Sequence, residues 1–316
     1  MFKMYNTNMQ TNITEETKEF IRGNWINVVS PSDEEIKTIC KNINIQEDFI
    51  RYALDPEEKA RIDVEDDDNT ILFIVDTPII EIESGAKVYS TAPIGIIFVR
   101  DDYIITVSLN KNPILEDLEK KKIKNIITYK KSRMLLQLFY SNAEMFLSLL
   151  KKLNKETEIA ENVLKNSMKN KALLKLLSLE KGLVYFTTSL KSNEVVMEKT
   201  MRGNLIKLYD EDEDILEDAI IENKQAIEMW KIYRDILTGT MDAYASIISN
   251  NLNGVMKYLT SITIILAIPT MIASYWGMNV PVPLQENPFG FVLIVIFSIL
   301  IGVIASVWLK KKGMLD

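Results

Sequence analysis

The stretch YLTSITIILAIPTMIASYW, Tyr258 to Trp276, decides the fold of this chain. It contains 19 residues and no charged side chain. At a rise of ~1.5 Å per residue, a helix of this length covers ~28 Å, close to the ~30 Å thickness of the hydrocarbon core of a bilayer. Buried helices of soluble proteins rarely run so far without a charge, so the stretch predicts a membrane-spanning helix.

A second uncharged stretch, the 22 residues from Pro288 to Leu309, predicts a second span. Lys257 precedes the first span and Lys310 to Lys312 follow the second, whereas the connecting loop, residues 277–287, contains no Lys or Arg. The positive-inside rule therefore predicts a multi-pass protein of the cell (inner) membrane. Both termini, including a basic tail at residues 310–316, are expected in the cytosol and the loop outside.

The composition limits the chemistry open to the chain. It has 316 residues, no histidine, one cysteine and a net charge of −7. Catalytic triads that need histidine are excluded, a zinc site is disfavoured, and any metal must be bound through oxygen, which suits Mg²⁺. The negative charge argues against nucleic acid as a partner. No GxxxxGK[ST] motif is present, which argues against an ATP-driven pump, and we expect neither enzymatic activity nor an organic cofactor.

The part before the spans has two patterns. Residues 1–128 read as a mixed α/β domain, in which Ser32 and Glu35 form a capping box at a helix start. Three β-rich runs follow, and the last two are joined by a tight turn at Asp101-Asp102. The runs are Ile71–Ile82, Tyr89–Val99 and Tyr103–Leu109.

Helical spacing replaces the β pattern from about Tyr129. It predicts two long antiparallel helices and then a third, which starts near Asp210 and has no evident stop before the membrane. The fold class is therefore α+β, with an αβα domain at 1–128, a helical bundle and stalk at 129–257, and spans at 258–276 and 288–309.

A stripe of small and polar residues follows the third helix into the first span at alternating steps of three and four. This is the 3.5-residue repeat of a coiled-coil seam, but without the expected Leu and Ile. Small residues allow close helix packing, and polar residues line water-filled cavities. A pore needs several copies of the chain, because one pair of spans cannot enclose it. The stripe is Gly239, Asp242, Ser246, Ser249, Asn253, Met256, Thr260, Thr263, Ala267, Thr270, Ser274 and Gly277.

The motif YWGMN, Tyr275 to Asn279, closes the first of the two spans. Its position and its Gly-Met-Asn sequence resemble the signature of CorA-type magnesium channels. The resemblance continues without gaps upstream to Tyr233, and NWINV (Asn24–Val28) resembles the start of that family's N-terminal domain. It implies a homopentamer with a cytosolic funnel that carries hydrated Mg²⁺ passively through the bilayer, with Co²⁺ and Ni²⁺ as further candidate ions.

The resemblance also implies roles for particular residues. Gly277, Met278 and Asn279 correspond to the selectivity filter at the outer mouth, and Met256 and Leu259 to a hydrophobic constriction. Leu259, rather than Thr260, would face inward at that level. The full set of expected pore-lining residues is Asp242, Asn253, Met256, Leu259, Thr263, Thr270 and Ser274.

A regulatory Mg²⁺ site between neighbouring subunits is also implied. Asp218 falls at the family's position for it, but the partner acid falls near Tyr52, which leaves Asp55, Glu57 and Glu58 as candidates. The acids 211–214 either strengthen this negative field or only favour a helix N-terminus. In the outer loop, Glu286 either concentrates cations or is a plain exposed acid.

Two alternatives remain from the sequence. A ZntB-like zinc transporter is similar in pattern, but Met278 and the absence of histidine favour Mg²⁺. A membrane-anchored α/β adaptor or sensor, in which the spans only tether the domain, would have no need of the polar stripe.

Overall fold

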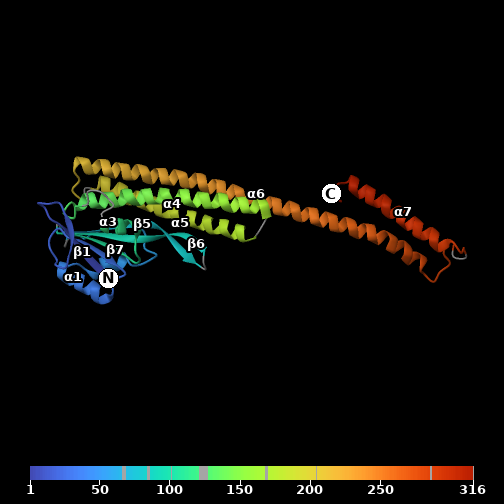
Figure 1. Ribbon diagram of the computed structural model, residues 1–316, viewed down its shortest axis with the longest axis horizontal. Coiled ribbons are helices and arrows are strands. Elements are labelled where there is room, and N and C mark those ends of the chain that lie inside the picture. Colours follow the sequence, from blue (N-terminus) through green and yellow to red (C-terminus); the bar gives the residue numbers. More distant parts are fainter. Residues whose placement is uncertain are drawn as a thin grey trace. The chain divides into compact units, whose positions relative to one another are not determined.

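The computed structural model describes residues 1–65, 69–83, 86–100, 102–120, 127–167, 170–203, 205–284 and 287–315. It opens with a seven-stranded sheet in the order β2-β1-β3-β7-β6-β5-β4 (Figure 1). The strands are β1 (Phe2–Thr7), β2 (Thr14–Thr17), β3 (Trp25–Val29), β4 (Arg61–Glu65), β5 (Thr70–Glu83), β6 (Ala86–Val99) and β7 (Tyr103–Ser108).

Only one neighbouring pair in this sheet is parallel, β3 with β7, where Trp25 lies opposite Ile104. The other pairs are antiparallel. The three β-rich runs are confirmed as β5, β6 and β7. Val99 pairs with Tyr103 across the predicted turn, although Asp101 lies outside the described residues.

One face of the sheet is covered by α1 (Asp33–Ile43) and α2 (Glu47–Tyr52). The capping box at the start of α1 is confirmed. The backbone N–H of Glu35 donates to Ser32 Oγ at 3.3 Å, and the carboxylate of Glu35 accepts from the Ser32 N–H at 2.9 Å. Buried Ile36, Ile39 and Ile50 then pack against the strands.

The opposite face is covered by α3 (Pro113–Glu119), α4 (Lys131–Ser167), α5 (Asn170–Arg202) and the beginning of α6 (Asp210–Trp276). Strand β5 shows why both faces are covered. Phe73 and Val75 point into this second core, whereas Leu72 and Ile74 point into the first. A strand buried on both sides needs this continuous apolar run, so the αβα layering follows from the sequence of β5.

The second core requires a close approach of α5 to β6. A Cβ added to Gly182 would lie 2.7 Å from Tyr89 Cβ and 3.2 Å from the Tyr89 carbonyl oxygen. Glycine therefore lets the helix contact the strand directly. Nearby, the rings of Phe146 and Phe186 meet edge to face at 5.3 Å, which fixes α4 against α5 in the same layer.

The predicted long helices are confirmed as α4 and α5, which lie side by side in Figure 1, and as α6, which has 67 residues and contains Pro269. The last helix, α7, spans Gly290–Lys311. It starts two residues later than the predicted second span and includes Lys310 and Lys311 of the predicted tail. The chain divides into two compact units, Met1–Thr238 and Gly239–Asp316.

Candidate ion pathway and metal sites

The candidate pathway lies on the part of α6 that belongs to the unit Gly239–Asp316. On one side of this helix, Ser261 is fully buried, and its hydroxyl reaches the carbonyl oxygen of Met314 at 3.0 Å. Farther along, a Cβ added to Gly302 of α7 would lie 4.0 Å from Pro269 Cγ. Therefore α7 and the residues after it cover the side of α6 that carries Ser261 and Pro269.

Within the span, the expected pore-lining residues lie on the opposite side of α6. A helix turns by ~100° per residue, so Leu259, Thr263 and Thr270 lie within ~20° of the point opposite Ser261. Met256 and Leu259 are 54% and 58% exposed. The remaining members, Asp242, Asn253, Thr263, Thr270 and Ser274, are exposed as well. The stripe is thus not used for packing against α7.

Two threonines of the stripe present oxygen outward. The Thr263 hydroxyl donates to the Leu259 carbonyl at 2.9 Å, and the Thr270 hydroxyl donates to the Leu266 carbonyl at 2.8 Å. Since each hydroxyl proton is directed into its own helix, the lone pairs of the oxygen are left as acceptors. An acceptor oxygen on an exposed helix face can receive a proton of a water molecule that hydrates a cation.

The Gly-Met-Asn motif follows directly on the end of α6 at Trp276. Gly277 N–H donates to the Ala273 carbonyl at 2.9 Å, and Met278 N–H contacts the Tyr275 carbonyl at 3.4 Å. The chain therefore leaves the helix within these residues, and Gly277, Met278 and Asn279 are all exposed. Glu286 lies outside the described residues, so its two interpretations remain predictions.

Asp218 is exposed on α6 and takes part in an acidic group that the sequence reading missed. Glu144 of α4 raises the pKa of the Tyr140 hydroxyl; burial raises it too, as do the charges of Glu222 and Asp218. These carboxylates therefore lie close enough to Tyr140 to act on it together. The four-residue spacing of Asp218 and Glu222 shows in the sequence that these two acids are neighbours on one helix face. The sequence does not show that Glu144, which lies on α4, joins them.

The candidate partner acids lie in the segment after α2. Asp55 Oδ1 accepts the Glu57 N–H at 2.9 Å, and Glu58 is paired with Arg61 at 3.0 Å. Among the described residues of one chain, no three acidic or cysteine side chains are grouped to hold a metal ion. Asp218 and these acids thus form no complete metal site within one chain, and the regulatory site stays a prediction about two subunits.

The acids at the start of α6 have a local role. Arg133 of α4 donates to Glu211 at 2.6 Å and to Asp212 at 2.9 Å. These hydrogen bonds raise the pKa of Arg133, and the same contact lowers the pKa of Glu211. Asp212 is almost fully buried. Because both acids are paired with Arg133, the structure favours the interpretation that Glu211 and Asp212 stabilise the start of α6, and not the one in which they attract cations.

Comparison with known proteins agrees with this architecture. A model of the CorA family, described as "CorA-like Mg2+ transporter protein", matches residues 22–311. A cobalt/magnesium transport protein CorA of Methanocaldococcus jannaschii is 30% identical over 299 residues, which cover 92% of this chain and 90% of the relative. The corresponding protein of Thermotoga maritima is 34% identical over 145 residues, 42% of this chain and 41% of the relative.

Solved structures give the same result. The complete structure of the CorA magnesium transporter from Methanocaldococcus jannaschii superposes with a TM-score of 0.84 at 27% identity, covering 99% of this chain and 98% of that chain. The ZntB cytoplasmic domain from Vibrio parahaemolyticus has a TM-score of 0.59 at 9% identity, covering 78% of this chain and 98% of that one. The latter likeness concerns the fold alone.

Two helices of this chain, α6 and α7, are long and apolar enough to cross a bilayer, as expected of a membrane protein with an α/β domain. The chain belongs to the CorA family of Mg²⁺ transporters. Mg²⁺ is the ion that this family transports, and transport agrees with the expectation that the chain is not an enzyme.

Proposed function

We propose that five copies of this chain form a channel for passive Mg²⁺ uptake across the cell membrane. The observation that carries the proposal is the side of α6 opposite Ser261. There, Leu259, Thr263 and Thr270 are exposed while α7 covers the other side. Five such faces around an axis would enclose a path lined mainly by small and polar residues. The two spans of a single chain cannot enclose such a path.

Selection occurs at the outer mouth. Mg²⁺ sheds its water reluctantly and prefers oxygen ligands. Five Asn279 side chains, with backbone carbonyls of Gly277 and Met278, offer oxygens to the hydrated ion and avoid the cost of dehydration. A ring of carboxylates would hold the ion more tightly and slow its release. The same octahedral oxygen coordination accepts Co²⁺ and Ni²⁺, and the relatives are named for cobalt as well as magnesium.

The gate and the driving force follow from the same helix. Rings of Met256 and Leu259 close the path by excluding water. The membrane potential contributes ~2.3 kcal/mol per charge per 100 mV, and about twice that for a divalent cation moving inward. Both termini lie in the cytosol in this arrangement, since Lys257 and Lys310 flank the spans on one side.

Regulation comes from cytosolic Mg²⁺ bound between subunits near Asp218. A bound ion bridges acidic surfaces of adjacent subunits and stabilises the closed state, and its loss lets the like charges repel. Glu144 and Glu222 add to the field of Asp218, because all three act on Tyr140. Asp55, Glu57 and Glu58 are the candidates on the neighbouring subunit.

Two measurements test this function. Native mass spectrometry of the purified protein is expected to give five subunits, and a monomer or dimer would exclude the pore. Liposomes containing the protein are expected to take up Mg²⁺ down a gradient without ATP. Uptake of Zn²⁺ in preference to Mg²⁺, or no uptake of either ion by a pentamer, would contradict the proposed channel.

A further inference from the structure

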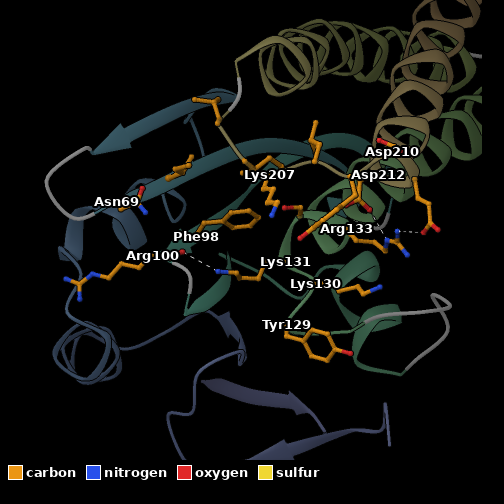
Figure 2. Close-up of a pocket in the computed structure, with 17 residues that line it drawn as sticks. Asn69, Phe98, Arg100, Tyr129, Lys130, Lys131, Arg133, Lys207, Asp210 and Asp212 are labelled. Atoms are coloured by element: carbon orange, nitrogen blue, oxygen red, sulfur yellow. Dashed lines mark hydrogen bonds and ion pairs between the residues drawn. The ribbon is translucent and has the colours of Figure 1, made fainter. Parts of the chain in front are cut away.

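A cavity of about 810 Å³ lies within the unit Met1–Thr238, at the end of the β5–β6 pair, and has no part in the proposed ion pathway (Figure 2). Three separate segments line it: the strand ends with Asn69, Phe98 and Arg100, the start of α4 from Tyr129 to Arg133, and the segment from Leu205 to Asp212 before and into α6. Its volume is within the usual range of small-molecule sites.

Positive charge gathers in this cavity although the whole chain is acidic. Among the described residues of the lining, two acids, Glu211 and Asp212, are bound to Arg133. The other described cations of the lining include Lys131 and Lys207, and the other described acid is Asp210; the side chain of Arg100 points away from the cavity in Figure 2.

These cations differ in how they are held. The Lys131 ammonium is oriented by the Arg100 carbonyl oxygen at 3.2 Å and is partly buried, whereas Lys207 is exposed and lies 5.2 Å from the Tyr209 ring. In the view of Figure 2, the ends of Lys131 and Lys207 lie on either side of the Phe98 ring. One ammonium held by a hydrogen bond and one exposed ammonium therefore line the same cavity.

The remainder of the lining is apolar or aromatic. The half-buried Leu205 and Leu208 supply hydrocarbon beside the largely buried Ile71 and Phe98, and Tyr129 is held by a hydrogen bond of 3.0 Å from its hydroxyl to Asn12. A free inorganic anion would use only the lysines. A ligand with a flat ring and a phosphate chain uses both parts of the lining, because rings stack on apolar surface and phosphates bind ammonium groups.

We propose that this cavity binds a nucleoside phosphate, with the phosphates at Lys131 and Lys207 and the ring against the apolar lining around Phe98. Such a ligand would connect the β5–β6 end, the start of α4 and the start of α6. It would be a regulatory ligand, not a cofactor. The assignment does not rest on the proposed channel, since binding is measured without transport.

Binding of ATP to the full-length protein in detergent tests this assignment. Isothermal titration with Mg²⁺ chelated is expected to show one ATP per subunit, bound more tightly than pyrophosphate or adenosine. The double variant Lys131→Gln, Lys207→Gln is expected to raise the dissociation constant for ATP about tenfold or more. Each charge-assisted hydrogen bond to a phosphate adds to the binding free energy, and both are lost. Lys152→Gln, an exposed change elsewhere on α4, is the matched control and is expected to bind like the wild type.

Several outcomes would overturn the assignment. The first is that ATP does not bind, and the second is that ATP binds all variants with equal affinity. The third is that pyrophosphate binds as tightly as ATP, which would mean that the cavity is a site for inorganic anions. Adenosine as tight as ATP would remove the role of the lysines. If the double variant does not fold, Lys207→Gln alone decides, because this exposed side chain can be changed without opening the core; unchanged ATP affinity in that variant contradicts the assignment.

Discussion

Ser261 and Met314 lie 53 residues apart in the chain, and the serine hydroxyl shares its one proton between the Met314 carbonyl at 3.0 Å and the Lys257 carbonyl of its own helix at 2.8 Å. At this contact one side of α6 is buried under the end of the chain. Leu259, two residues earlier, is thereby left on the far side and is 58% exposed. Together with the approach of Gly302 to Pro269, this contact shows which side of α6 is covered, and the expected gate residue lies on the other side.

Leu259→Ser is the direct test of the gate. A hydroxyl in place of the isobutyl group wets the constriction, so Mg²⁺ flux at high internal Mg²⁺ is expected to rise about threefold or more. Ile264→Ser, a change of the same kind about 140° around the helix from Leu259, is the control and is expected to leave the flux at high internal Mg²⁺ unchanged. Uptake into liposomes preloaded with Mg²⁺ measures both. An equal effect of the two variants would remove Leu259 from the gate.

Asn279→Ala is expected to reduce Mg²⁺ uptake about tenfold or more, since the ring of amide oxygens at the mouth is lost. Asn279→Asp is expected to bind the ion more tightly while lowering the maximal flux, because release from carboxylates is slower. Liposome flux and competition by Co²⁺ separate the two effects. Val280→Ala is the neighbouring control, and a normal flux in Asn279→Ala would sink the filter assignment.

Asp218→Asn is expected to weaken the protection of the N-terminal unit by Mg²⁺ against protease. The Mg²⁺ concentration for half protection is expected to rise about threefold to tenfold, as one charge of the site is lost. Glu222→Gln is expected to have a smaller effect in the same direction. Asp214→Asn, an exposed acid one turn earlier on α6, is the control. If Asp214→Asn raises the Mg²⁺ concentration for half protection as much as Asp218→Asn does, the effect reflects the overall negative charge and not a specific Mg²⁺ site.

Local patterns predicted some of these elements and not others. Successive residues from Ile71 to Val75 pack alternately into the two cores, one on each face of the sheet. The apolar character of this run was enough to predict β5. In contrast, β1 and β2 were missed, because they are short and partly polar; β1 pairs with β2 on one side and with β3 on the other. The parallel pairing of β3 with β7 likewise leaves no mark in either segment.

The candidate site shows the same division. The membrane spans and the stripe depend on local composition and periodicity, so they could be predicted from the sequence. The pairing of Arg133 with Asp212, 79 residues away, depends on how α4 lies beside the start of α6. The same packing brings the charge of Glu144 and that of Asp218 to bear on Tyr140. Contacts of this kind need the tertiary structure.

Gly182→Ala is expected to destabilise the N-terminal unit. The new Cβ would lie 2.7 Å from Tyr89 Cβ, which is close to the backbone and cannot rotate away. Overpacking costs about 1–3 kcal/mol, and better helix propensity returns about 1 kcal/mol. A fall of about 2–4 °C in the unfolding temperature is expected for a unit of this size. Lys181→Ala on the exposed side of α5 is the control, and an unchanged midpoint in Gly182→Ala would contradict the close packing.

The buried carboxyl group of Asp76 is expected to make the stability of the N-terminal unit depend on pH. Its side chain is buried in the sheet, and burial raises the pKa of the carboxyl group. A hydrogen bond from Ser189 works in the opposite direction, and the charge of Glu58 adds to the increase. The folded pKa is therefore above the unfolded one, which is about 3.9. Protonated Asp76 favours the folded state below about pH 4, and this stability is lost as the pH rises through the folded pKa.

Asp76→Asn removes this titration and keeps an acceptor for Ser189. The variant is therefore expected to gain stability relative to the wild type as the pH rises from about 4 to 8, while the two converge toward the acid end. Unfolding temperatures of both proteins across this range measure the difference. Asp48→Asn, an exposed acid on α2, is expected to show no such trend. A difference between Asp76→Asn and the wild type that does not depend on pH would mean that the aspartate is not titrating in the folded protein.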